Sequence, residues 1–440
     1  MDILIKVLQL LLSLSILVVF HEMGHFLAAR AFKVRVEKFY LFFDPWFSLF
    51  KFKHKDTQYG IGWLPLGGYV KIAGMIDESM DKEQMKKPPQ PWEFRSKPAW
   101  QRLIIMLGGV TVNVILAMVI YISLLSIHGE EYLPTSELKY GIVVDSLGYE
   151  MGLRNGDRIL TIDGKEIEDF NKIPEALILD EAKTIQVIRE GSQMDISVPE
   201  GMTAKLLKHE TPFLSYRIPF IVGGFAEGSP ALEAGLQEKD YIIGVNDIHA
   251  PFFDQFKEAV AGFAGEEISL SVVRDSGTLF LPVRVTDEGM IGVAPVGQLD
   301  FYFDLHQREY SFFEAIPAGI VKTFNGIGSY FKQLKLLVRP ETKAYESIGS
   351  FITIGSIFPS TWDWHVFWRL TAFLSIMLAI LNVLPIPALD GGHVLFLLFE
   401  IISGRKPGEK FMEIAQMAGM IILLGLFILA MGNDILKLFR

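Results

Sequence analysis

Cysteine is absent from this sequence of 440 residues. Without cysteine the chain cannot build a disulfide scaffold, a zinc ribbon, a cysteine-ligated iron–sulfur cluster or a cysteine nucleophile. Charge is also sparse, because charged residues make up only 21% of the chain. Acids outnumber bases, and the net charge of −10 argues against a nucleic-acid-binding protein. A chain that is 50% hydrophobic, with a mean hydropathy of +0.32, is too apolar to be disordered and is expected to contain membrane spans.

Four apolar stretches are long enough to cross the hydrocarbon core of a bilayer, which takes about 20 residues. These stretches are Ile3–Phe20, Leu103–Ile127, Val366–Leu384 and Ile414–Gly432. The first could instead be a cleaved signal peptide. However, Lys6 is the only positive charge at its start, and His21-Glu22 follows where a small-residue cleavage site would lie. We therefore expect a multi-pass α-helical membrane protein with four transmembrane helices.

The charges divide into two unlike regions. Residues 127–310 hold 32 acidic and 15 basic residues, a net charge of −17, and the rest of the chain has a net charge of +7. The link between the first two spans, residues 30–102, carries 14 Lys and Arg residues, and the link between the last two carries Arg405, Lys406 and Lys410. The positive-inside rule therefore predicts both links in the cytoplasm, and both termini and the long acidic segment outside. In a bacterial inner membrane, this outside is the periplasm.

The acidic segment contains an internal repeat. Residues 152–167 (GLRNGDRILTIDGKEI) align with residues 235–250 (GLQEKDYIIGVNDIHA) at an offset of 83 residues. Two strands, Thr184–Ile188 and Ile268–Val273, and two short helices, Lys172–Leu179 and Phe253–Phe263, are expected in matching places. The sequence thus predicts two copies of a small α+β domain.

The repeats resemble bacterial PDZ domains, and the second copy resembles them more closely. Ser229-Pro230-Ala231 is typical of that family, and Gly289-Met290-Ile291-Gly292-Val293 resembles its carboxylate-binding loop. The resemblance implies that Gly289, Ile291 and Gly292 bind a peptide C-terminus. The first copy lacks the Ser-Pro pair. Alternatively, either copy could be a folded spacer.

Two histidines and a glutamate close the first apolar stretch, in the order His21-Glu22-Met23-Gly24-His25. On a helix, residues four apart lie on one face, so His21 and His25 can hold one Zn²⁺, and Glu22 can deprotonate a water. Ionisable side chains at the end of an apolar span are costly unless they are paired or functional. The alternative is a purely structural cluster.

Zinc needs a third protein ligand. The first and third spans both run from outside to inside, so their distal ends meet at the same, cytoplasmic face of the membrane. Asp390 follows the third span and is therefore a candidate ligand, with His393 and His54 as rivals.

At these residues the chain resembles the site-2 protease family of intramembrane zinc metalloproteases. The segments that carry the resemblance are HEMGH at 21–25, Gly60-Ile61-Gly62 followed by 65–71, 94–102 (FRSKPAWQR), 382–393 (NVLPIPALDGGH) and the tandem PDZ-like repeats. The chain departs from the family at Gly109-Val110, where Gly-Pro is usual, and at Ser347-Ile348-Gly349-Ser350.

The resemblance implies roles for individual residues. His21, His25 and Asp390 are implied as zinc ligands and Glu22 as general base, while Asn113 and Asn382 are implied as polar groups near the substrate. Both asparagines could instead join helices by hydrogen bonds. The Gly-rich stretch from Gly60 to Tyr69, including Gly62, is expected to form a membrane-associated β-hairpin that could add an unwound substrate as a strand.

The implied substrates are single-pass membrane proteins, foremost an anti-sigma factor already cut on its outer side. Rival functions are the clearance of leftover signal peptides, a non-catalytic PDZ receptor for peptides, and a metal transporter.

Ser311–Val338 has apolar residues at helical spacing and is expected to be an amphipathic helix on the outer membrane surface. The expected segments are 1–34 (first span), 35–101 (cytoplasmic link), 102–127 (second span), 128–219 and 220–300 (PDZ-like domains), 301–345 (interfacial helix), 346–393 (third span) and 394–440 (loop and fourth span).

Overall fold

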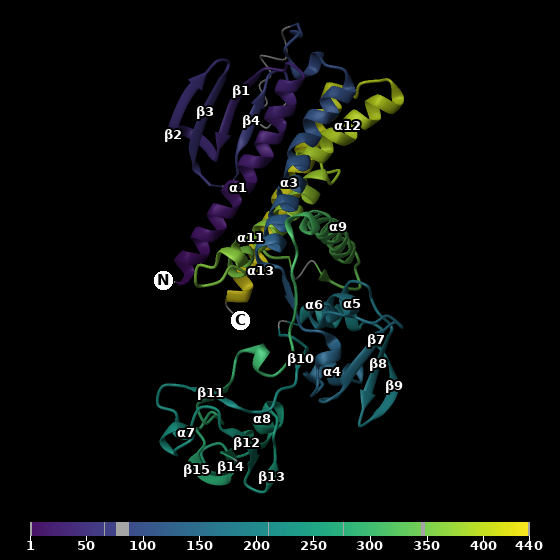
Figure 1. Ribbon diagram of the computed structural model, residues 1–440. Helices are drawn as coiled ribbons and strands as arrows, with labels where there is room; N and C mark the ends of the chain where they lie inside the picture. Colours follow the sequence, from purple (N-terminus) through teal and green to yellow (C-terminus); the bar gives the residue numbers. More distant parts are fainter. Residues whose placement is uncertain are drawn as a thin grey trace. The chain divides into compact units, whose positions relative to one another are not determined.

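The computed structural model describes residues 2–65, 67–75, 88–209, 211–275, 277–344 and 348–438. Leu66 and residues 76–87 of the expected cytoplasmic link, and Ser347, therefore lie outside the described residues. The chain divides into two compact units (Figure 1). One unit comprises Met1–Gly129, Glu309–Lys335 and Tyr345–Arg440, and the other comprises Glu130–Arg308 and Leu336–Ala344.

Four helices of the first unit are long and apolar enough to cross a membrane. They are α1 (Asp2–Ala31), α3 (Ala99–His128), α11 (Trp364–Val383) and α13 (Glu409–Leu438). The prediction of four spans is confirmed at this level. Helix α1 continues past Phe20 to Ala31, so the HEMGH turn is helical.

Small and hydroxyl side chains join the long helices. Helices α1 and α3 approach most closely at Gly24 and Gly108, where a Cβ atom on Gly24 would lie 2.2 Å from the carbonyl oxygen of Gly108. Thr371 of α11 donates a buried hydrogen bond of 3.0 Å to Ser13 of α1. Glycines that allow close contact and hydroxyls that bond across helices are typical of membrane helix packing.

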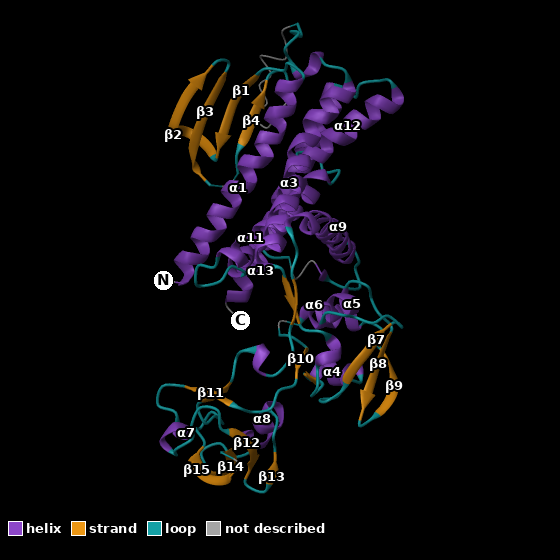
Figure 2. Cartoon of the chain, in the orientation of Figure 1, coloured by secondary structure: helices purple, strands orange, loops and turns teal. Residues whose placement is uncertain are grey.

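The segment between α1 and α3 contains a four-stranded sheet next to α1 (Figure 2). Its strands are β1 (Val36–Leu41), β2 (Phe43–His54), β3 (Thr57–Leu64) and β4 (Tyr69–Ile72), in the order β2-β3-β1-β4. Strand β3 pairs with β2 on one side and, in parallel, with β1 on the other. The link does contain an antiparallel hairpin, formed by β2 and β3, but it does not lie at the expected residues 60–69, because β3 and β4 each pair with β1.

The described residues of this part of the chain contain further helices. Helix α9 (Phe312–Leu337) confirms the expected helix over residues 311–338, while its position on a membrane surface stays a prediction. Helix α10 (Phe351–Ser356) precedes α11, and the turn η1 (Phe94–Ser96) precedes α3. Helix α12 (Asp390–Ser403) was not expected, because its sequence follows two prolines and reads as part of a loop.

The second unit contains two hydrophobic clusters, one within residues 133–303 and one within residues 220–291. The elements around the first are β5 (Glu130–Tyr132), η2 (Thr135–Glu137), β6 (Ile142–Val144), α4 (Ser146–Met151), β7 (Arg158–Ile162), η3 (Phe170–Lys172), α5 (Ile173–Ile178), β8 (Thr184–Arg189), β9 (Ser192–Ser197), α6 (Met202–Lys208) and β10 (Leu214–Tyr216). Those around and after the second are β11 (Val222–Phe225), α7 (Pro230–Glu233), β12 (Tyr241–Val245), β13 (Ile248–His249), α8 (Phe253–Ala261), β14 (Glu267–Arg274), β15 (Gly277–Arg284), β16 (Val293–Pro295), η4 (Leu299–Phe301) and β17 (His306–Arg308).

The same ion pair occurs once in each cluster. Arg189 binds Asp157 at 2.7 and 2.8 Å and also donates to the carbonyl oxygen of Gly152. Arg274 binds Asp240 at 2.6 and 2.7 Å and donates to the equivalent carbonyl oxygen of Gly235. The internal alignment pairs Gly152 with Gly235 and Asp157 with Asp240, and the two arginines follow at similar distances along the chain. The assignment of both copies as PDZ domains stays a prediction.

Candidate metal centre

His21 and His25 project from consecutive turns of α1 into the helix bundle. They are 8% and 5% exposed, and their Nε2 atoms lie 3.3 Å apart. The helical spacing that predicted this arrangement is therefore present in the folded chain. Two buried imidazoles need partners, and these come from other helices.

Asp390 lies at the first residue of α12, directly after a turn that follows α11. Its Oδ2 atom lies 3.2 Å from Nε2 of His21 and 3.1 Å from Nε2 of His25. Gly391 makes this turn possible, because a Cβ atom there would lie 2.1 Å from the carbonyl oxygen of Leu384. Among the described residues, these three form the one group of His, Asp or Glu side chains that could hold a metal ion.

The spacing of the three atoms fits a tetrahedral zinc site. With ligand bonds of about 2.0–2.1 Å, neighbouring ligand atoms of a tetrahedron lie about 3.3 Å apart. The donor chemistry agrees. Nδ1 of His25 lies 2.8 Å from the carbonyl oxygen of Ile105, which only accepts, so Nδ1 carries the ring proton and a neutral ring turns the Nε2 lone pair toward Asp390. That lone pair and a carboxylate oxygen at 3.1 Å repel each other unless a cation lies between them.

Glycine in α3 makes room for the histidines. A Cβ atom on Gly109 would lie 2.5 Å from Nε2 of His25 and 2.6 Å from Cε1 of His21. In the sequence, Gly109 stands out only as part of a departure from the family pattern. The adjacent glycines at 108 and 109, within an apolar span, were the available signal for a close helix contact.

Replacing Gly109 with alanine is expected to weaken zinc binding by about 10-fold or more, because the added methyl group displaces both imidazoles. Zinc affinity, measured by competition with a chelator, checks this. The matched control is Gly425→Ala in α13, where a Cβ atom meets nothing within 4 Å, and its zinc affinity should equal that of the parent. Unchanged affinity in Gly109→Ala would contradict the packing argument.

Both predicted asparagines lie beside His21. Asn113 is fully buried, with Nδ2 at 3.3 Å from Nδ1 of His21. Asn382, near the end of α11, has Nδ2 at 3.5 Å from Nε2 of the same ring. The two amides thus face opposite nitrogens of one histidine.

Glu22 lies beside the ligand histidines and next to strand β4. A Cβ atom on Gly68 would lie 3.7 Å from Cγ of Glu22, and β4 contacts α1, the helix that carries Glu22. The edge strand of the sheet therefore borders the candidate base.

Gly60 and Gly62 serve close packing within the sheet. A Cβ atom on Gly60 would lie 2.4 Å from the ring of Tyr40, and one on Gly62 would lie 2.1 Å from the carbonyl oxygen of Phe43. Because β1 and β2 occupy both edges of β3, this strand has no edge left for a substrate. The predicted addition of a substrate strand at Gly60 and Gly62 is therefore not possible in this sheet. In the strand order of the described sheet, β4 is the last strand and pairs with β1.

The rival ligands lie apart from this centre. His54 is exposed at the end of β2. Nε2 of His393 lies 3.2 Å from Nε2 of Gln416 in α13. His393 also lines a cavity of about 410 Å³, together with Phe396, Leu397 and Met412.

The predicted peptide-binding loop in the second unit is held against α7. The carbonyl oxygen of Ile291 accepts from Ser229 Oγ at 3.0 Å and from the Ala231 backbone at 3.2 Å. Gly289 and Gly292 have φ values of +75° and +72°, which favour glycine. The Ile291 side chain is buried in the core rather than presented to a ligand.

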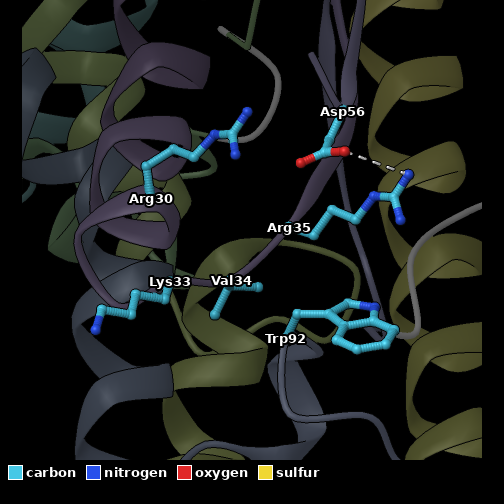
Figure 3. A pocket seen from close by; sticks show the side chains of 6 residues that line it. All are labelled: Arg30, Lys33, Val34, Arg35, Asp56 and Trp92. Carbon is cyan, nitrogen blue, oxygen red and sulfur yellow. Dashed lines mark ion pairs between the residues drawn. The ribbon is translucent and has the colours of Figure 1, made fainter.

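A second cavity, of about 500 Å³, lies at the C-terminal end of α1 (Figure 3). It is lined by Arg30, Lys33, Val34, Arg35, Asp56 and Trp92. Figure 3 shows the three cationic side chains pointing in different directions, and Arg35 approaches Asp56 at 3.8 Å. None of the predicted site residues lines this cavity, so it does not compete with the metal centre as the reaction site.

Comparison with known proteins gives the family. The sequence profile described as Peptidase family M50 matches residues 9–426. The chain is 28% identical to the "Regulator of sigma E protease" of Haemophilus influenzae, over 97% of this chain and 98% of that protein. It is 30% identical to "Protease RseP" of Yersinia pestis, over the full length of both. A Campylobacter jejuni protein named "Putative zinc metalloprotease" is 29% identical, over 99% of this chain and 94% of that protein. A buried His–His–Asp centre and a match over nearly the whole chain agree: this chain belongs to Peptidase family M50 and is a zinc metalloprotease.

Proposed function

We propose that this protein is an intramembrane endopeptidase that makes the second cut in single-pass membrane proteins. Its foremost substrate would be an anti-sigma factor that has already lost its outer domain, as the family resemblance implies. The name of the Haemophilus influenzae relative, "Regulator of sigma E protease", agrees with a role in sigma-factor control. The observation that carries the proposal is the set of three ligand atoms, 3.1–3.3 Å apart. Two of them lie on α1, which is long and apolar enough to cross a membrane, and the third lies at the start of α12.

The residues divide the chemistry of peptide hydrolysis among them. His21, His25 and Asp390 would hold zinc, which when bound supplies Lewis-acid chemistry that acidifies water and polarises a carbonyl group. Glu22 takes a proton from the attacking water and then passes it to the nitrogen of the leaving amine. Asn382, beside the metal-facing nitrogen of His21, can donate a hydrogen bond to the substrate carbonyl.

A substrate helix has to unwind before its amide bonds are accessible, and its freed backbone groups need new partners in lipid. Strand β4, the last strand of the described sheet, could supply those partners by adding the substrate as a strand. The contact of β4 with α1, and the approach of Gly68 just before β4 to Glu22, support this role. The substrate strand would thus pair with Tyr69–Ile72 rather than with Gly60–Gly62.

The sheet itself would lie against the cytoplasmic half of the bilayer. Strand β2 exposes large apolar side chains, with Trp46 91% and Leu49 65% exposed. Apolar side chains in such numbers favour burial in lipid. The 14 basic residues of this link support its cytoplasmic side, and the acidic segment with both termini would then be periplasmic.

The outer segment would act as a size filter made of two PDZ domains. The matching Arg189–Asp157 and Arg274–Asp240 pairs support two copies of one domain. In the second copy, Gly289, Ile291 and Gly292 precede strand β16, whose described pairing is with β11 alone. A peptide with a free C-terminus could add to β16 beside this loop.

Deleting residues 129–300 is expected to let the enzyme cut substrates whose outer domain is still attached. The reason is that the deletion removes the filter and leaves the metal centre unchanged. Cleavage of trimmed and untrimmed forms of one substrate, by the full-length and deleted enzymes, checks this. If the deletion leaves the untrimmed form uncut while the trimmed form is still cleaved, the filter is disproved.

Purified enzyme incubated with a panel of single-span proteins, with and without a zinc chelator, tests the proposed function. We expect chelator-sensitive cleavage of trimmed anti-sigma-type substrates. Cleavage of signal-peptide remnants alone would favour clearance as the function. Peptide binding without any cleavage would favour the receptor.

A further inference from the structure

Helix α3 presents a stripe of three residues to the histidine pair. Ile105, Gly109 and Asn113 are spaced four apart and therefore lie on one helix face. The Ile105 carbonyl oxygen meets Nδ1 of His25 at 2.8 Å, and Gly109 makes room for both rings. The Asn113 amide meets Nδ1 of His21 at 3.3 Å. Each histidine thus has an α3 group at the nitrogen that faces away from Asp390.

If both Nε2 atoms bind the metal, the protonation of the two Nδ1 atoms is fixed. A neutral imidazole that gives the Nε2 lone pair to zinc carries its proton on Nδ1, and this N–H needs an acceptor. Ile105 supplies one for His25. For His21, the neighbouring group is Asn113, whose amide offers one acceptor, Oδ1, and one donor group, Nδ2.

The Asn113 amide is turned with its donor toward His21, which suits a ring without zinc. Its Oδ1 atom is buried and has no hydrogen-bond partner in the described part of the chain. A half-turn about the Cβ–Cγ bond exchanges the two atoms, so that Oδ1 accepts from Nδ1 of His21. The same rotation moves Nδ2 to the buried place that Oδ1 now occupies.

We propose that Asn113 is a positioning residue for the zinc centre, whose amide oxygen accepts the Nδ1 proton of His21 and so directs Nε2 to the metal. This inference rests on the proposed function, because it takes His21 as a zinc ligand. It assigns Asn113 a role different from the substrate contact that the family resemblance implies. The backbone of Asn113 has a separate partner, because Ser375 of α11 donates to its carbonyl oxygen at 2.8 Å.

Zinc affinity of the full-length protein, measured by chelator competition, tests the proposal. Asn113→Leu keeps the volume and removes the acceptor, so its zinc affinity should fall about 10- to 100-fold. Asn113→Asp keeps an acceptor and should bind zinc within about threefold of the parent. The control is Ser375→Ala, which breaks the bond to the backbone of the same residue and should leave zinc affinity unchanged.

A role in helix packing predicts a different pattern. Asn113→Leu would then lower the unfolding temperature of the metal-free protein and keep its zinc affinity, which overturns the proposal. Equal losses of affinity in Asn113→Leu and Asn113→Asp also overturn it. If Asn113→Leu does not fold, Asn113→Ala carries the same prediction. The absorption spectrum of the Co²⁺-substituted protein is a second readout and should change in Asn113→Leu but not in Ser375→Ala.

Asp390→Ala separates failure of this inference from failure of the proposed function. If Asp390→Ala loses zinc while Asn113→Leu retains it, only the role of Asn113 is disproved. If Asp390→Ala retains zinc at full affinity, the metal lies elsewhere and the proposed centre fails with it.

Discussion

The Glu22→Gln variant is expected to lose cleavage activity by about 10²- to 10⁴-fold while keeping its zinc. Glutamine has the shape of glutamate, but its amide cannot take a proton from water at neutral pH. The loss therefore reflects removal of the general base rather than of a metal ligand. Initial rates on a single-span substrate in detergent, with zinc content measured on the same sample, check both parts.

Glu37→Gln provides a matched control. Glu37 lies on β1 and faces Lys71 at 3.6 Å, away from the histidines, so its loss should leave the rate unchanged. A Glu22→Gln enzyme that keeps more than about a tenth of the parent rate would contradict the assignment of the general base.

The second large effect is expected from Asp390→Ala, which should abolish both stoichiometric zinc and cleavage. Two imidazoles alone leave a zinc ion short of the three protein ligands that catalytic sites use. Metal analysis of the purified variant, together with its cleavage rate, measures the two losses.

His393→Ala is the control on the same helix. It removes the contact with Gln416 and leaves the three ligand atoms in place, so the variant should retain zinc. If His393→Ala loses the metal and Asp390→Ala keeps it, the third ligand is His393.

The metal centre could be predicted largely from sequence, because it depends on two simple rules. The spacing of His21 and His25 follows from helix geometry, and the meeting of Asp390 with them follows from counting spans of alternating direction. The sequence alone left His393 and His54 open as rivals. The fold separates them, because α12 begins at Asp390 and carries His393 toward α13.

The role of the glycines could not be predicted in the same way. Gly60 and Gly62 are expected from the sequence in a hairpin that adds a substrate strand, whereas they allow a ring and a neighbouring strand to approach β3. Glycine favours both turns and close contacts, and only the partner strand decides between them. Gly24 on α1 and Gly109 on α3 make contacts between helices that are distant in sequence. The adjacent glycines of α3 therefore indicate a close helix contact but not its partner.

The order of strands in the sheet could not be predicted from the sequence, for a related reason. The parallel pairing of β1 with β3 joins strands that are not consecutive. As a result β4, rather than β3, is the last strand of the described sheet, beside Glu22. Turn signals show where strands end but not which strands pair. The substrate strand was therefore expected close to its proposed place, but on the wrong side of the Leu64–Tyr69 connection.

The most direct test is to map the cut in a single-span substrate by mass spectrometry, after reconstitution of enzyme and substrate in lipid vesicles. We expect one main cut within the apolar span, near its cytoplasmic end. This cut should disappear in Glu22→Gln and in the presence of a zinc chelator. A cut outside the apolar span, or a cut that persists in Glu22→Gln, would contradict intramembrane cleavage at this centre.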